Sequence, residues 1–382
     1  MHTEIIEKIG DIGCEKWNRL TGSDNPFIQY EFLSALEKNR CLHDYGWYPQ
    51  HVVLYDDNNS DDLIAATPLY IKDNAYGELI FDHAWSDAYY RAGIPYYPKL
   101  VTAIPYTPVT GPRLLVAPEQ NYSSCARQLV AAAIEHAKQL NASSMHWLFT
   151  DQRDSGFFKQ QNYAMRLGCQ FHWQNKNYTS FDNFLSQLTS SKRKKIKRER
   201  RQVVEQNVQL EIRHGNEMSD ELWEIYHGFY TNTFDRKSGL PTLQLDFFKE
   251  IGETMPSNIV VVFAKYEGKY VASAFNLRDR TTLYGRHWGC NTEFHSLHFE
   301  ACYYQGLDYC IAHKLSSFEP GAQGEHKISR GFLPTAIWSA HWIAHPEFAT
   351  VISQFVEREQ IGMQHYLQSL MEHSPYKDRC VL

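Results

Sequence analysis

Apolar positions recur along this chain with two different periods, which predict a mixture of strands and helices. Runs of β-branched residues that alternate with polar ones or continue unbroken, bounded by turn residues, predict strands at residues 51–55, 63–71, 144–149, 259–266, 270–277, 282–288 and 315–319. Apolar residues about 3.6 positions apart predict helices at residues 27–39, 122–140, 181–206, 221–234, 245–253, 297–313 and 347–370. Strands and helices are therefore mixed in both halves of the chain.

Three of the expected strands follow one another closely enough to form a meander. Glu267, Gly268 and Lys269 provide a short hairpin between the first two, and Asp279 begins the next turn. Residues 259–288 are thus expected to form a three-stranded antiparallel sheet.

A weak internal repeat predicts the domain organisation. In the first half, the segment EHAK at 135–138 precedes Ser143-Ser144, a strand, Gly156-Phe157 and the segment FHW at 171–173. In the second half, the segment AHK at 312–314 precedes Ser316-Ser317, a strand, Gly331-Phe332 and the segment AHW at 340–342. Because the order is preserved, the best explanation is a tandem duplication, with one α/β domain at residues 1–176 and another at 177–382.

The composition indicates which class of protein and which cellular compartment we expect. The chain has 382 residues of which 43% are apolar, enough for two globular domains. It contains no long apolar run and starts without a basic, apolar leader, so we expect a cytoplasmic protein with no membrane span. Its eight cysteines show neither a CxxC pair nor zinc-ligand spacing, which favours reduced thiols and no metal.

One strongly basic segment stands out from an acidic background. The net charge is -6, yet residues 192–201 hold eight basic side chains and one acid. Clustered cations at a domain junction can bind the phosphates of a nucleotide, a CoA-like carrier or tRNA. The candidate phosphate-binding residues are Lys192, Arg193, Lys195 and Arg198. The acidic remainder argues against DNA, and a solvated helix face is the alternative interpretation.

A second group of candidates comes from the last strand of the meander and the following helix. The strand ends in the segment YGRHWG at 284–289. On the helix, Tyr303 is expected on the core face, and Glu300 and Tyr304 are expected to share the neighbouring face. We expect Arg286 to stabilise an oxyanion and Glu300 to point along the end of the sheet. A solvated helical glutamate is the alternative for Glu300.

The end of the strand at 315–319 and the loop after it contain the largest group of candidate catalytic and binding residues. Burial at a sheet edge can raise the pKa of Glu319 until it can take a proton from an amine, while His326 already titrates near neutrality. Gly321 allows close approach of the backbone, and Lys327 would provide a cationic anchor. A glycine-rich connection with solvated charges is the alternative. The candidate substrate-binding residues are His287, Trp288, Tyr303, Tyr304, Gly321, Gln323, Lys327 and Arg330.

The sequence does not support several other classes of enzyme. The sequence contains no Walker A loop, GxGxxG, GxSxG or HExxH segment, which disfavours P-loop NTPases, dinucleotide enzymes, α/β hydrolases and zincins. The histidines have no spacing that is typical of metal ligands.

Several of these segments resemble the Fem-like predicted N-acyltransferase family of bacteria. The resemblance is carried by residues 190–201 (SSKRKKIKRERR), 284–289 (YGRHWG), 297–306 (LHFEACYYQG) and 318–327 (FEPGAQGEHK). It implies an α+β fold with two tandem GNAT-like domains, each a twisted mixed sheet flanked by helices. It also implies transfer of an acyl or aminoacyl group to an amine.

The resemblance leaves two donors open. GNAT enzymes that use acetyl-CoA commonly carry a pyrophosphate-binding loop after the fourth strand, and the segment WGCNTEFHS at 288–296 lacks that pattern. Relatives that build peptidoglycan cross-bridges use aminoacyl-tRNA instead. We therefore expect acyl-CoA or aminoacyl-tRNA as co-substrate, no permanently bound cofactor, and a small-molecule or peptide amine as acceptor.

The predicted reaction is attack of the amine on an activated ester or thioester where the two domains meet, with Glu319 or His326 as base. A non-catalytic module that binds a cell-wall peptide or RNA is the alternative.

Overall fold

The computed structural model describes residues 1–22, 24–57, 59–236, 239–322 and 324–377. The chain forms two compact units, each built from separate parts of the sequence. Unit 1 comprises Met1–Gly168 and Ala336–Gln364, and unit 2 comprises Cys169–Thr335 and His365–Leu382. Three elements run along the chain from one unit into the other: β9 (Ala164–Gln174), β15 (Leu333–Ile343) and α12 (Pro346–Glu372).

The units differ from the expected domains in two respects, the first of which is that residues 169–176 belong to unit 2. The sequence placed everything after residue 176 in the second domain, whereas residues 336–364 group with unit 1. The reason is a strand ladder: Trp338–Ile343 of β15 pair antiparallel with β8 (Ser144–Thr150) of unit 1. A single domain boundary cannot describe this chain, because the chain passes from one unit to the other three times.

Unit 1 contains two sets of paired strands. The first is antiparallel throughout, in the order β1 (His2–Ile6), β3 (His51–Asp56), β4 (Asn59–Thr67) and β7 (Leu115–Val116). The second runs from β15 to β8, β6 (Lys99–Thr102), β5 (Tyr70–Lys72) and β2 (Trp47–Pro49), with β6 and β8 parallel.

The helices of unit 1 are α1 (Cys14–Thr21), α2 (Tyr30–Lys38), α3 (His83–Arg91), α4 (Tyr122–Gln139) and α5 (Gln152–Gln160). The Asn121 side chain caps α4 by accepting a 2.9 Å hydrogen bond from the Ser124 N–H. The apolar stripe of α4, which includes Leu129 and Ala133, packs into the same buried core as Leu54 and Trp147.

Unit 2 is organised around one mixed sheet. Its order is β10 (Gln209–His214), β11 (Ile259–Tyr266), β12 (Lys269–Arg278), β13 (Thr282–Cys290), β14 (Ser317–Glu319) and β9. The strands β11, β12 and β13 pair antiparallel, which confirms the predicted meander. β14 is parallel to β13 and antiparallel to β9.

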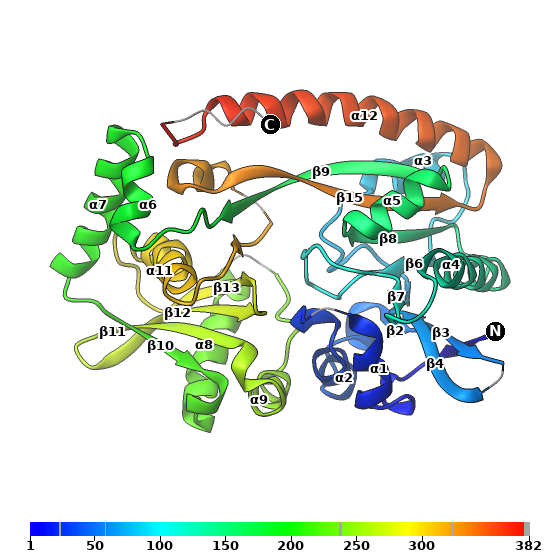
Figure 1. The fold of residues 1–382 in the computed structure, drawn as a ribbon, viewed down its shortest axis with the longest axis horizontal. Helices are drawn as coiled ribbons and strands as arrows, with labels where there is room; N and C mark the ends of the chain where they lie inside the picture. The colour runs from blue at the N-terminus through cyan, green and yellow to red at the C-terminus, as the bar shows by residue number, and fades with distance from the viewer. Residues whose placement is uncertain (23, 58, 237–238, 323, 378–382) are drawn as a thin grey trace. The chain divides into compact units, whose positions relative to one another are not determined.

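Helices pack on this sheet in two groups (Figure 1). One contains α8 (Asp220–Arg236) and α9 (Leu245–Thr254), whose Tyr226 and Phe248 rings contact Phe275 of β12. The other contains α6 (Phe181–Gln187), α7 (Ser190–Glu205) and α11 (Gln305–Ala312). Gly306 of α11 lies so close to Phe318 that an added Cβ would stand 2.4 Å from that ring.

Three predicted elements are divided in the structure. The helix expected at 181–206 breaks at Leu188, whose extended backbone (ψ 153°) pairs in a β-bridge with Tyr376. The strand expected at 63–71 ends at Thr67 before Pro68, which cannot donate to a ladder. The helix expected at 297–313 consists of α10 (Leu297–Phe299), the π-helical turn η6 (Glu300–Tyr304) and α11.

The same succession of elements occurs twice along the chain. The first is α4, β8, α5 and β9, and the second is α11, β14, the 3-10 helix η7 (Glu325–Arg330) and β15. Of the paired segments, residues 171–173 and 340–342 lie on β9 and β15, and the Ser-Ser pairs stand at the starts of β8 and β14. Gly331-Phe332, in contrast, follow η7, whereas Gly156-Phe157 lie within α5.

Within the described ranges, no helix is both long and apolar enough to cross a bilayer. The cysteines in the same ranges are free thiols, and no group of three or more His, Cys, Asp or Glu side chains is arranged to hold a metal ion.

Candidate active site

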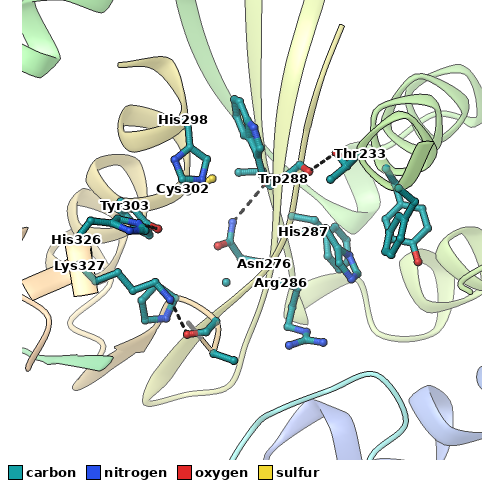
Figure 2. A pocket seen from close by; sticks show the side chains of 18 residues that line it. Thr233, Asn276, Arg286, His287, Trp288, His298, Cys302, Tyr303, His326 and Lys327 are labelled. Atoms are coloured by element: carbon teal, nitrogen blue, oxygen red, sulfur yellow. Dashed lines mark hydrogen bonds between the residues drawn. The ribbon is translucent and has the colours of Figure 1, made fainter. Parts of the chain in front are cut away.

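An open cavity of about 520 Å³ lies in unit 2, beside the second half of β13 (Figure 2). Its lining residues come from α8, β12, β13, α10, η6, η7 and the loop that follows β14. All of these belong to unit 2. The loop after β14 is the segment in which the sequence placed the reaction.

The cavity exists because two parallel strands diverge. The ladder between β13 and β14 ends at the pair Tyr284 and Glu319, while β13 continues to Cys290. Pro320 has no N–H to extend the ladder, and Gly321 adopts a φ of +91°, a conformation that glycine tolerates best. At the point of divergence an added Cβ on Gly285 would lie 3.1 Å from the Pro320 Cα.

The diverging edge of β13 offers backbone groups to the cavity. The Trp288 carbonyl accepts a 2.7 Å hydrogen bond from the Thr233 hydroxyl of α8, and both residues line the cavity. In a strand the N–H and C=O of one residue point to the same side, so the Trp288 N–H faces the same edge.

His326 and Tyr303 form a hydrogen-bonded pair in the cavity wall. The Tyr303 hydroxyl and the His326 Nε2 are 2.9 Å apart. Tyr303 is buried on η6, and burial raises its pKa well above the usual range, so the phenol stays protonated. His326 is exposed on η7. Partial burial, followed by the charges of Arg330, Lys327 and Lys195, lowers the pKa of His326 and keeps the imidazole neutral near pH 7.

Two cations line the same cavity. The buried Lys327 ammonium donates a 2.7 Å hydrogen bond to the Gly321 carbonyl. Burial lowers the pKa of Lys327 to about 8 and that of Arg286 to about 10. Figure 2 shows the two side chains extending from different elements, with the Arg286 guanidinium directed away from Tyr303 and His326.

Glu319 lies at the end of β14, next to the cavity but not in its lining. Its side chain is 15% exposed, and one carboxyl oxygen is buried without a hydrogen-bond partner in the structure. Burial, reinforced by the charge of Asp279, raises the pKa of Glu319 to about 8, whereas burial lowers the pKa of nearby His172 to about 4. Their closest atoms are 3.9 Å apart, and between these two pH values both groups are uncharged.

The raised pKa of Glu319 makes a pH-dependent contribution to stability. The carboxyl is protonated in the folded state up to about pH 8 but ionises near 4.5 in the unfolded chain, so stability falls as pH rises between these values. Glu319→Gln should therefore match the wild type near pH 4.5 and be more stable above about pH 8, with about 1.4 kcal/mol per unit of pKa difference. Urea unfolding at several pH values measures this effect.

Glu253→Gln provides the control for that series, because Glu253 is an exposed residue of α9. It should leave the pH dependence of stability unchanged. A Glu319→Gln protein that is less stable than the wild type at pH 8 would show that the carboxyl is ionised and held by a partner.

The basic helix α7 is connected to the cavity through Arg330. Glu199 of α7 accepts a 2.8 Å hydrogen bond from the Arg330 guanidinium, which also donates to the His326 carbonyl at 2.9 Å. Lys195 is four residues before Glu199. Burial and then the Arg330 charge lower the pKa of Lys195, and the Lys195 charge contributes to lowering the pKa of His326. Arg198 lines a separate open cavity of about 580 Å³ beside α7. Lys192 and Arg193 are half-buried and belong to neither cavity lining.

The structure brings together part of the predicted site. The cavity lining includes the following predicted residues: Arg286, His287, Trp288, Tyr303, Gly321, His326 and Lys327. Glu300, Tyr304 and Arg330 are buried outside it. Glu300 accepts hydrogen bonds from Arg200 at 3.1 Å and Gln305 at 2.8 Å, which favours a structural ion pair. Gln323 lies outside the described residues.

The sequence analysis did not identify the residues of α8 and β12 that line the cavity. Tyr230, Thr233 and Phe234 come from α8, and Asn276 comes from β12. Tyr230 and Phe234 are spaced i, i+4 on one helix face, but that signal is equally typical of core packing. Cys302 also lines the cavity, between Glu300 and Tyr303, where the π-helical turn changes the face that each side chain occupies.

Several solved structures share this fold at low sequence identity. The C-terminal domain of a putative lysylphosphatidylglycerol synthetase from Agrobacterium fabrum matches with a TM-score of 0.54 and 9% identity, over 91% of this chain and 97% of that one. FemX matches with a TM-score of 0.53 and 11% identity, over 92% and 100%. L-PGS from Bacillus licheniformis matches with a TM-score of 0.51 and 10% identity, over 87% and 98%. The fold is that of tandem GNAT-like proteins.

The family model FemAB_like, described as peptidoglycan biosynthesis/recognition, matches residues 8–378. The chain therefore belongs to this family, as its motifs suggested. No curated protein matches it.

Proposed function

We propose that the protein is an N-acyltransferase that moves an acyl or aminoacyl group from an activated carrier to an amine. The observation that supports this most directly is the hydrogen-bonded His326 and Tyr303 pair, which lies in a cavity opened by the divergence of β13 and β14. A neutral imidazole can accept the amine proton, a protonated phenol can relay it, and nearby cations can stabilise the charge that develops during amide formation.

Amide formation begins with attack of the amine nitrogen on the carbonyl carbon of the carrier ester or thioester. The Tyr303 hydroxyl takes a proton from that nitrogen as its own proton passes to the His326 Nε2. The bond between the carbonyl carbon and the carrier oxygen or sulfur then breaks. The proton returns through Tyr303 to the leaving group, so the products are the amide and the free carrier alcohol or thiol.

Negative charge develops on the carbonyl oxygen during the attack. Arg286 and the Trp288 N–H of β13 line the cavity together with Lys327 of η7, and preorganised donors of this kind stabilise an oxyanion strongly when water is excluded. Glu319, the other base that the sequence suggested, is protonated near neutrality and lies behind the lining. We therefore assign the base role to His326.

The carrier is either an acyl-CoA or an aminoacyl-tRNA, both of which present phosphates. The cationic face of α7, with Lys192, Arg193, Lys195 and Arg198, is proposed to bind them. The acceptor is a small molecule or peptide amine, as the peptidoglycan-related family description suggests. A cytoplasmic location, where both carriers occur, belongs to the same proposal.

Mass spectrometry of molecules that copurify with the protein tests this function. The expected result is a CoA species or a tRNA, and an amide product after incubation with amines. A bound peptide or RNA that carries no acyl group, together with no amide product, would favour the non-catalytic module instead. Salt titration separates the carriers, because binding of single-stranded RNA weakens with a log-log slope of about -0.7 per phosphate contacted.

A further inference from the structure

His287 of β13 lines the candidate active site, but the proposed reaction does not use it. The Tyr226 hydroxyl of α8 lies 3.0 Å from the Nδ1 atom of its ring. Tyr226 is buried, and burial raises the pKa of its phenol well above the usual range, so the hydroxyl keeps its proton near neutrality. The two side chains therefore share one hydrogen bond, whose direction depends on where the hydroxyl hydrogen points.

The direction of this hydrogen bond follows from the other partners of Tyr226. Among the residues that the structure describes, His287 is the single hydrogen-bond partner of the Tyr226 hydroxyl. If the hydroxyl accepted from Nδ1, its own hydrogen would have no acceptor, which is costly in a protein interior. The hydroxyl therefore donates to Nδ1, and Nδ1 carries no proton.

The tautomer of His287 follows from this direction. Burial, followed by the charge of Arg286, lowers the pKa of His287 well below its usual range, so the imidazole is neutral near pH 7. A neutral imidazole holds one proton, and since Nδ1 accepts a hydrogen bond, that proton is on Nε2. His287 is thus a hydrogen-bond donor through Nε2.

This donor is both accessible and fixed in direction. Nε2 has no hydrogen-bond partner within the described ranges, yet it is not shut off as a buried unpartnered atom, so it is open to the cavity that His287 lines. The ring stacks on Phe275 with 5.9 Å between centroids and 18° between planes, and the Tyr230 ring meets it edge-on at 4.9 Å. A donor that is held in place before binding loses little entropy when a ligand arrives.

A fixed, neutral N–H group favours one kind of ligand atom. It brings no charge, so it attracts a carboxylate or phosphate less than a guanidinium or ammonium does. It offers no acceptor to a ligand N–H group, because Tyr226 already occupies Nδ1. The partner that fits is the carbonyl oxygen of an ester, thioester or amide.

We propose that His287 is a substrate-binding residue that donates from Nε2 to a carbonyl oxygen of the substrate, and that Tyr226 is the positioning residue that fixes its tautomer. This inference rests on the proposed function only in that substrates with carbonyl groups enter the cavity. The oxygen can belong to the activated acyl group of the carrier or to an amide group of a peptide acceptor.

Nitrogen NMR of the imidazole rings tests the tautomer in the protein without ligand. At about pH 8, above the ordinary histidine pKa of about 6.5, His287 should show a protonated Nε2 and an unprotonated Nδ1. His227, whose Nε2 lies 3.1 Å from the Leu243 carbonyl, is a reference for this tautomer. His214, whose Nδ1 lies 3.0 Å from the Ile259 carbonyl, is a reference for the opposite one. The signals that disappear in His287→Gln belong to His287, and a protonated Nδ1 there would overturn the assignment.

Tyr226→Phe separates positioning from packing. It keeps the buried ring and deletes the hydroxyl, so the His287 signals should shift toward those of a mixture of the two tautomers. Tyr270→Phe, which deletes a hydroxyl of β12 that donates to Glu211, should leave them unchanged. Circular dichroism shows whether each variant is folded. Signals of His287 that are identical in folded Tyr226→Phe and in the wild type would reject the role of Tyr226.

Two small probes test the carbonyl contact in the wild-type protein and separate its sources. Ethyl thioacetate presents the carbonyl of an activated acyl group, and N-acetylglycinamide presents the carbonyls of a peptide. At least one probe should shift the Nε2 resonance of His287 in a saturable manner and leave that of His227 in place. The effective probe identifies which substrate supplies the oxygen. If neither probe shifts His287 up to its solubility limit, the inference is wrong.

These spectra do not depend on turnover. A saturable shift of His287 in a protein that makes no amide product would reject the proposed function and leave this inference standing. Amide formation without any response of His287 to either probe would reject this inference alone.

Discussion

His326→Ala is expected to lower kcat for acyl transfer by about 10²- to 10⁴-fold, the usual contribution of general acid-base catalysis. The variant removes the group that receives the amine proton through Tyr303, whereas the cavity and its cations remain. Because the imidazole is exposed on η7, its loss should change thermal stability only slightly. Steady-state kinetics with the cognate pair, together with a thermal unfolding curve, measure both effects.

Two further variants help to interpret a loss of activity in His326→Ala. Tyr303→Phe keeps the buried ring but deletes the hydroxyl that links the cavity to His326, so it should reduce kcat by a similar factor. His365→Ala, at an exposed position of α12, should behave as the wild type.

Since burial and three cations lower the pKa of His326, wild-type kcat should rise as this group deprotonates below pH 6.5 and then level off. Full activity in His326→Ala would reject its role as base.

Glu199→Ala is expected to destabilise the protein by about 3 to 5 kcal/mol, the cost of leaving a buried charge without its partner. The Arg330 side chain is 2% exposed, and its guanidinium lies 2.8 Å from the Glu199 carboxylate and 3.5 Å above the Phe299 ring. Tyr304 donates to the same carboxylate. Loss of Glu199 therefore leaves both Arg330 and Tyr304 with unsatisfied groups in the core of unit 2, and urea unfolding measures the result.

A neighbouring pair on the same helix provides the control. Arg201 and Glu205 form a 3.3 Å salt bridge that is more than half exposed, so Glu205→Ala should cost less than about 1 kcal/mol. Glu199→Ala combined with Arg330→Met should recover part of the lost stability, because no buried charge is then left alone. Equal small effects of Glu199→Ala and Glu205→Ala would show that the Arg330 charge is solvated.

The candidate site could be predicted from sequence where residues are adjacent along the chain. The glycine-rich loop after β14 attracted attention because charged residues followed a strand, and the structure places Gly321, His326 and Lys327 of that loop in the cavity lining. Glu300 looked similar by the same reasoning, yet its carboxylate pairs with Arg200. Local sequence shows which chemical groups are available, but it does not show which partner neutralises each of them.

Residues on separate elements could not be related by pattern alone. The cavity wall from α8 depends on how that helix packs against β12 and β13, and helical spacing of aromatic residues is typical of any buried helix face. The sequence of neither strand predicts where β13 and β14 separate, because that depends on where their parallel ladder ends.

The sequence by itself determined the meander, most of the long helices, the basic segment and the family, because these depend on local periodicity and on contiguous motifs. Tertiary structure alone decided that residues 336–364 group with unit 1, that Glu319 is half-buried outside the cavity lining, and that two cations but no carboxylate occur among the described lining residues. Burial and long-range pairing set these properties, and neither is a property of neighbouring residues along the chain.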